Sequence, residues 1–94
     1  MKMEWDPRKA ARNLSKHEVS FEEAATVFSN PLAVIFEDEW HSESEAREII
    51  IGHSAINQLL VVVFVDREAS IRIISARRAT ASEQNDYEEN TNKK

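Results

Sequence analysis

The sequence predicts an α+β fold with two N-terminal helices, a mainly antiparallel sheet of four to five strands and a C-terminal helix. Two helix-start signals lie within the first 23 residues, four β-branched runs follow between residues 33 and 74, and a third helix-start signal comes after them. The 94 residues, with 41% hydrophobic and 31% charged side chains, have the composition of one globular domain, which we expect to span residues 1–94.

The N-terminal part of the chain predicts two helices. Residues 3–5 could form a short strand, after which Asp6-Pro7 is typical of an N-cap followed by proline at the first helical position. We therefore expect a helix over residues 7–16. Ser20 and Glu23 form a capping box that begins a second helix, which Asn30-Pro31 ends. Its apolar residues are spaced to make one buried face: Phe21, Ala24, Ala25 and Phe28.

The middle of the chain predicts strands, because β-branched runs alternate with polar turns. The runs are residues 33–36, 48–51, 59–65 and 71–74. The connections over residues 53–58 and 66–70 are short enough for hairpins, so the sheet should be largely antiparallel. The unbroken apolar run 59–65 indicates a central strand covered on both faces. A second capping box, Thr80 with Glu83, predicts a helix that continues to about Asn90.

The composition excludes several kinds of chemistry. The chain has no cysteine, so disulfides, thiolate nucleophiles and cysteine metal sites are absent. His17, His41 and His53 are the possible nitrogen ligands, and their spacing brings no two together, so we expect no metal. With Gly52 as the one glycine, no glycine-rich loop can hold a nucleotide phosphate. We expect no cofactor.

The apolar runs are too short for a membrane protein. The first ten residues lack the apolar stretch of a signal peptide, and the longest apolar run, 59–65, is far below the roughly 20 residues of a membrane helix. A cytoplasmic location without membrane contact is therefore expected.

The charge is unevenly distributed along the chain. The formal net charge is −5, which by itself argues against a nucleic-acid ligand. Residues 1–17, however, carry five basic and two acidic side chains, whereas residues 18–48 carry nine acids and Arg47 alone as a base. A basic face on an acidic body could bind RNA, although solvated surface charge explains the pattern as well. The candidate RNA-binding residues are Lys9, Arg12, Lys16, Arg72 and Arg78.

Three segments of the chain resemble the BrnT family of toxins. They are Trp5-Asp6-Pro7 continuing through Lys16-His17-Glu18 to Ala24; the stretch from Asp38 through His41 and Arg47 to Gly52; and Arg72-Ile73-Ile74-Ser75-Ala76-Arg77-Arg78-Ala79-Thr80 with Glu83 and Tyr87. The last segment is the most specific. The chain departs from the family pattern at Glu18, where the family usually has glycine, and in its acidic balance.

The resemblance implies a RelE-like fold and a toxin that inhibits translation by cutting RNA. It also implies a cognate antitoxin, BrnA-like, with a ribbon-helix-helix DNA-binding pattern. Toxin and antitoxin could form a heterotetramer, which would reach operator DNA through the antitoxin. A catalytically inactive toxin-fold module that pairs with a protein partner is the alternative: the acidic balance favours it, whereas Arg47, Arg77 and Tyr87 favour the ribonuclease.

RNA cleavage by attack of the 2′-hydroxyl requires a base, an acid and a cation that stabilises the phosphorane oxygens. Arginine suits the cationic role, because its planar group holds two phosphate oxygens and keeps its charge. The resemblance matches Arg77 and Arg47, for which a surface ion pair is the alternative.

Histidine and tyrosine supply the remaining candidates. His41 and His17 could move protons near neutral pH, although His17 at a helix C-terminus is better explained by the helix dipole. Tyr87 could stack on a base or pack on the sheet, and packing is favoured. Glu83 is expected to serve as a capping residue rather than as a base.

Overall fold

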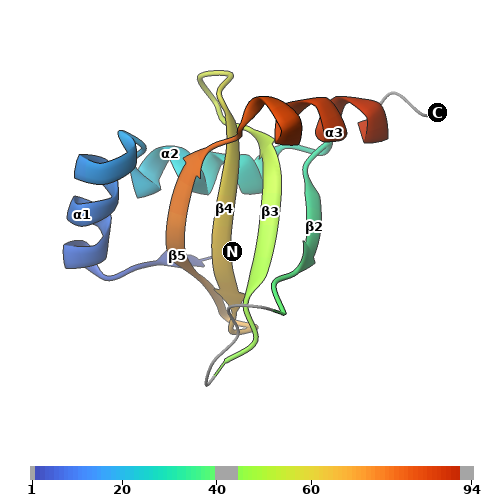
Figure 1. The fold of residues 1–94 in the computed structure, drawn as a ribbon. Helices are drawn as coiled ribbons and strands as arrows, with labels where there is room; N and C mark the ends of the chain where they lie inside the picture. Colours follow the sequence, from blue (N-terminus) through green and yellow to red (C-terminus); the bar gives the residue numbers. More distant parts are fainter. Residues whose placement is uncertain (1, 40–44, 92–94) are drawn as a thin grey trace.

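The computed structural model describes residues 2–39 and 45–91, which form a five-stranded sheet with three helices (Figure 1). The strand order is β1-β5-β4-β3-β2. β1 pairs in parallel with β5, and the other neighbours are antiparallel. The elements are β1 (Lys2–Glu4), α1 (Pro7–His17), α2 (Phe21–Thr26), the 3-10 turn η1 (Val27–Ser29), β2 (Val34–Glu37), β3 (Glu48–His53), β4 (Leu59–Asp66), β5 (Ser70–Arg78) and α3 (Ala81–Thr91). The predicted α+β class is confirmed.

Helix α1 begins at its predicted cap and ends at a strained residue. The Asp6 carboxylate accepts a hydrogen bond from the Arg8 amide at 2.8 Å. At the other end Glu18 has a φ of 59°, in the left-handed region, and its amide donates to the Leu14 carbonyl at 2.9 Å. Glycine is the usual residue at such a helix end because it has no Cβ. The departure at Glu18 therefore costs about 1–2 kcal/mol of backbone strain without changing the helix end.

The core lies between α1, α2 and one face of the sheet. In Figure 1, α2 passes behind the strands and α1 lies beside β5. The fully buried side chains are Val19, Phe21, Ala24, Val27, Leu60, Val62, Phe64 and Ile73. Alternate residues of β4 face the other way, and Val61 and Val65 are each 5% exposed. The prediction that the strand at residues 59–65 is central is confirmed, and side chains on both of its faces are buried, although Val63 on the second face is only partly covered.

Asn13 connects α1 to the sheet through two hydrogen bonds and to the residues before α2 through a third. Its amide group donates to the carbonyls of Val19 at 2.9 Å and Ala76 at 2.8 Å, and its side-chain oxygen accepts from the Ala76 amide at 3.1 Å. Asn13 is 7% exposed, so these bonds replace water for buried polar groups. One side chain thus sets the distance between α1, the start of α2 and β5.

Gly52, the one glycine of the sequence, lies where β3 packs closely against Ala33, the residue that precedes β2. A Cβ at this position would stand 2.7 Å from the Ala33 Cβ and 3.2 Å from Val27 Cγ1. The close approach of backbone and side chain explains glycine here, because its φ is not in the left-handed region.

The second face of the sheet is partly open, and it carries Val61, Val63 and Val65 of β4. We call it the open face. An irregularity in the pairing of β4 with β5 lies at Val63 and Phe64, which pair with Ser75 and Ile73. Helix α3 crosses one end of this face (Figure 1). Among the described residues, no helix is long and apolar enough to cross a membrane.

Replacing Asn13 by alanine should destabilise the fold by about 3 kcal/mol, because three buried backbone or side-chain bonds are lost and the groups of Val19 and Ala76 stay unsatisfied. Urea unfolding followed by circular dichroism measures this. The matched control is Asn85→Ala on the exposed side of α3, which should change stability by less than about 0.5 kcal/mol. Equal effects of the two substitutions would contradict the role assigned to Asn13.

Candidate nucleic-acid groove

Two adjoining hollows lie where α1 meets the open face, and they share Lys9 and Ile74. Together they form one continuous surface, which we call the basic groove. Its charged or titratable members are Lys9, Arg12, Lys16, His17, Glu45, Arg47, Arg67 and Arg72, and its remaining members are Asn13, Val65, Ile74 and Ser75. Six cationic side chains and one carboxylate, Glu45, thus line the groove of a chain whose net charge is −5, and a second carboxylate, Glu4, contacts Arg67 and Arg72 from outside the lining. The structure supports a basic face on an acidic body.

Helical and strand periodicity bring these cations together. Lys9, Arg12 and Lys16 are spaced three and four residues apart, so they lie on one side of α1. On the sheet, Arg72 pairs with Val65 of β4. The amide of Asp38 donates to the Arg47 carbonyl at 2.9 Å, which continues the β2–β3 register. In the β3–β4 register Glu48 pairs with Phe64, so Arg47 lies on the other side of Val65 and two arginines flank one apolar side chain.

One end of the groove contains an ion-pair network. Arg67 binds Glu45 through two bonds, at 2.7 and 2.9 Å, and reaches Glu4 at 3.2 Å. Arg72 donates to the same Glu4 oxygen at 3.0 Å. Hydrogen bonds from Ser70 and Arg72 lower the pKa of Glu4, and the bonds from Arg67 lower the pKa of Glu45. Both carboxylates therefore stay charged and hold the two arginines in place.

The other end of the groove is less neutralised. In the described ranges, no ion pair is found for Lys9, Arg12 or Lys16. His17 closes this end of the groove, beside Lys16 and Ser75. Positive charge without a protein partner is the condition under which a basic surface attracts a polyanion.

Arg77 lies on the open face too, at the end nearest α3. Its guanidinium binds the Glu83 carboxylate through two bonds of 2.8 Å, and Glu83 also accepts from the Thr80 amide at 2.9 Å as the capping partner. The hydrogen bonds between the two side chains are the main cause of both pKa shifts. They lower the pKa of Glu83 to about 2 and raise the pKa of Arg77. The predicted capping role of Glu83 is confirmed, and the ion-pair alternative for Arg77 gains direct support.

The structure does not bring Arg77 and Arg47 together. Arg77 pairs with Val61, whereas Arg47 lies beside Val65, four residues further along β4. Four strand residues span about 13 Å. The two arginines share a face of the sheet, but they are too far apart to hold the same phosphate oxygens.

The remaining predicted site residues divide into three cases. Tyr87 is 6% exposed and its hydroxyl donates to the Leu32 carbonyl at 2.9 Å, which supports packing; burial raises its pKa. Arg78 alternates with Arg77 and lies toward the helical side, where it donates to the Gln58 side chain at 2.6 Å, outside the groove. His41 lies outside the described residues. In the described part of the chain, no three His, Asp or Glu side chains are placed to hold a metal.

Comparison with models of protein families identifies the family to which the chain belongs. Residues 5–83 match the model of the ribonuclease toxin BrnT of type II toxin–antitoxin systems. The chain belongs to this family. Among solved structures, the 1.1 Å crystal structure of the Brucella abortus ribonuclease toxin BrnT is similar, with a TM-score of 0.65 and 25% sequence identity over 85% of this chain and 97% of that one. A comparison with curated proteins gave no significant match.

Sequence reasoning missed the part of this BrnT-family groove built by Arg67, Glu4 and Glu45. Arg67 lies in a hairpin turn and Glu4 in the edge strand, 63 residues apart, and the parallel pairing of β1 with β5 brings them together. The available signal was the short segment at residues 3–5, which suggested a strand but not its neighbour.

The Arg77–Glu83 pair predicts an acid-sensitive contribution to stability. Because the folded-state pKa of Glu83 is lowered from 4.5 to about 2, the contribution is complete above about pH 4.5 and is lost as the pH falls toward 2. Glu83→Gln should therefore lower the free energy of unfolding at pH 7 by about 1–2 kcal/mol, after allowance for solvent screening.

Urea unfolding of Glu83→Gln and wild-type protein at several pH values between 7 and 2.5 measures this effect. The difference between the two should shrink below pH 4.5. Glu89→Gln, for which the described residues show no ion pair, is the control and should match wild type. A difference that stays constant down to pH 2.5 would contradict the assignment.

Proposed function

We propose that this chain is a metal-independent endoribonuclease toxin that inhibits translation by cleaving RNA and is neutralised by a cognate antitoxin. The observation that carries the proposal is the basic groove, in which six cations gather on a protein of net charge −5. Membership of the ribonuclease toxin family supports it. Under this proposal the fold is RelE-like and the antitoxin is a BrnA-like ribbon-helix-helix protein.

The groove fits a single RNA strand better than a small anion. The side chains of Lys9 and Lys16 are seven residues apart on α1, which separates their helix positions by about 10 Å. A surface of this length can contact more than one phosphate of a strand, and each contact releases a counterion. Binding should therefore weaken steeply as salt is added.

The chemistry assigned to the groove is stabilisation of negative charge. Arg47 and Arg72 flank Val65, and Lys9 lines the same hollow from α1. A phosphate seated there would meet cations from two sides above an apolar floor, where charge interactions are stronger than in bulk water. Arg67 holds Glu4 and Glu45, so it acts as a positioning residue for Arg72 rather than as a phosphate ligand.

Proton transfer requires a group within reach of the phosphate, and His17 is not one. His17 lies eight residues from Lys9 on α1, a helix distance of about 12 Å, so it does not reach a phosphate held beside Arg72. We assign His17 to RNA binding at the far end of the groove. His41 remains the candidate acid or base by family resemblance, and His41→Ala tests that role.

A second candidate function is pairing with a partner without catalysis. The observation that favours it is the engagement of Arg67, Arg72 and Arg77 in ion pairs with Glu45, Glu4 and Glu83. A protein whose arginines are held by its own carboxylates could keep the toxin fold and bind RNA weakly. The experiment below distinguishes the two candidates.

Induced expression of the chain alone should arrest bacterial growth and degrade RNA. Removal of charge at Lys9, Arg47 or Arg72 by alanine should lower RNA cleavage by the purified protein about 10²-fold or more, because each substitution removes a cation beside the scissile phosphate. Arg8→Ala and Arg78→Ala are controls, since both side chains lie outside the groove. If the groove variants are folded and as toxic as wild type, the proposed site is wrong.

Cleavage should also continue when divalent metal ions are removed with a chelator, since the proposed chemistry uses side chains of the chain. RNA is incubated with purified protein in the presence and absence of excess EDTA, and the products are separated by gel electrophoresis. Loss of cleavage with EDTA, restored by added Mg²⁺ or Mn²⁺, would contradict metal independence.

A further inference from the structure

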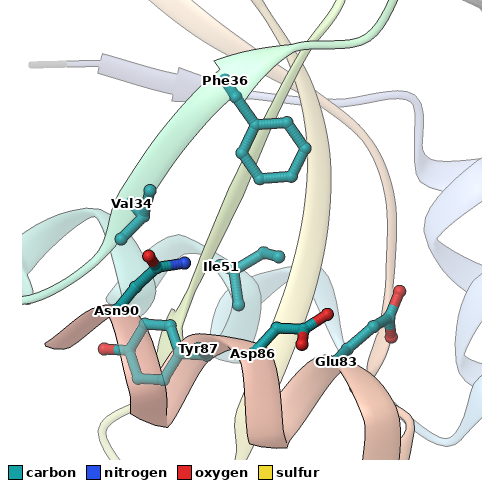
Figure 2. Close-up of a pocket in the computed structure, with 7 residues that line it drawn as sticks. All are labelled: Val34, Phe36, Ile51, Glu83, Asp86, Tyr87 and Asn90. Atoms are coloured by element: carbon teal, nitrogen blue, oxygen red, sulfur yellow. The ribbon is translucent and has the colours of Figure 1, made fainter. Parts of the chain in front are cut away.

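A second surface of the molecule differs from the basic groove in the sign of its charge. It is a cleft of about 290 Å³ between the edge of the sheet and α3, shown in Figure 2. Val34 and Phe36 of β2 and Ile51 of β3 form its floor, and residues of α3 form its wall. The wall residues are Glu83, Asp86, Tyr87 and Asn90. We call this surface the acidic cleft.

The floor of the acidic cleft consists of apolar side chains that are partly exposed to solvent. Val34 is 38% exposed and Phe36 is 45% exposed, on the same side of β2. Leu32, just before β2, is 59% exposed. In Figure 2 the side chains of Val34, Phe36 and Ile51 lie over the same side of the sheet, facing α3. Adjacent exposed apolar side chains with a polar rim are typical of a protein interaction site.

The strand beneath the cleft can also accept a neighbour. β2 is at the end of the strand order, and in the described residues no strand pairs with its outer edge. Because Asp38 donates inward to Arg47, alternation directs the backbone groups of Ile35 and Glu37 outward. An edge strand of this kind can pair with an extended segment of another protein.

The wall gives the cleft a negative charge, which comes from Asp86 in the lining. Helix α3 contains Glu83, Asp86, Glu88 and Glu89 and no lysine or arginine. Glu83 is neutralised by Arg77, whereas Asp86, on the cleft side, has no ion pair in the described part of the chain. The surface therefore complements a partner segment that carries lysine or arginine beside apolar side chains.

From this combination we infer that the acidic cleft is the docking surface for a basic, partly apolar segment of the antitoxin, separate from the RNA groove. The two surfaces share no lining residue, and they come nearest where Arg47 of the groove pairs with Asp38, two residues beyond Phe36 of the cleft. The inference rests on the proposed pairing with an antitoxin and not on RNA cleavage. An antitoxin seated here holds the toxin without replacing RNA in the groove by direct mimicry.

Binding measurements with the protein encoded by the reading frame adjacent to this chain's own test the inference. We expect Phe36→Ala and Asp86→Lys to weaken its binding at least tenfold, and the effect of Asp86→Lys to shrink as salt is added. The matched controls are Ile56→Ala, an apolar side chain 66% exposed outside the cleft, and Glu22→Lys on α2, and both should bind as wild type. The groove variants Lys9→Ala and Arg72→Ala should also bind as wild type.

The other outcomes of this experiment separate an error in the docking surface from an error in the proposed pairing. If wild-type protein binds and the two cleft variants bind equally well, the docking surface is wrong while the proposed pairing stands. If the groove variants lose binding instead, the antitoxin occupies the RNA groove, and the inference is overturned. Failure of wild-type binding overturns both pairing and inference, whereas RNA cleavage is measured separately.

A second copy of the chain is the competing occupant of the acidic cleft. Sedimentation of the chain alone distinguishes it, since the inference predicts the same molecular mass for wild type and Phe36→Ala. A wild-type dimer that Phe36→Ala converts to a monomer would overturn the inference in favour of self-association. Circular dichroism of each variant verifies folding, which a partly exposed β2 side chain should leave intact.

Discussion

The three hydrogen bonds of Asn13 are the constraint on which the arrangement of the site depends. They tie the middle of α1 to β5 at Ala76 and to the residue that leads into α2, so the axis and rotation of α1 are fixed together. Fixing the rotation of α1 places Lys9, Arg12 and Lys16 on the side that faces the groove. A buried amide that satisfies backbone groups is thus the structural cause of an exposed basic surface.

The same constraint explains how an acidic chain can present a positive groove. Positive charge gathers where α1 meets β5, and negative charge gathers on α3 and around β2, at the opposite edge of the sheet. Internal carboxylates then fix the arginines that the groove needs, since Glu4 contacts both Arg67 and Arg72. Net charge therefore says little about the ligand of this protein, whereas the division of charge between two surfaces is consistent with the two proposed partners of opposite charge.

Local signals predicted the elements, and long-range pairing decided the site. The caps at Asp6, Ser20 and Thr80 act within three residues, so the sequence was sufficient to place the helix starts. The hydrogen bond of Asn13 to Ala76 joins residues 63 positions apart, and the periodicity of apolar residues in the sequence cannot predict such a contact. The register of the strands separates Arg77 from Arg47, and the alternation of side chains along β5 places Arg78 outside the groove. Neither the family resemblance nor the counts of charged residues could predict these positions.

The chemistry of the ends produced on RNA tests the central claim most directly. Attack by the 2′-hydroxyl joins that oxygen to phosphorus and expels the 5′-oxygen, so purified protein acting on a defined RNA strand in the presence of a chelator should produce 2′,3′-cyclic phosphate and 5′-hydroxyl ends. The Lys9→Ala/Arg72→Ala double variant should leave most of that RNA intact. Fragments with 3′-hydroxyl and 5′-phosphate ends, or RNA that stays intact with wild-type protein, would contradict the account.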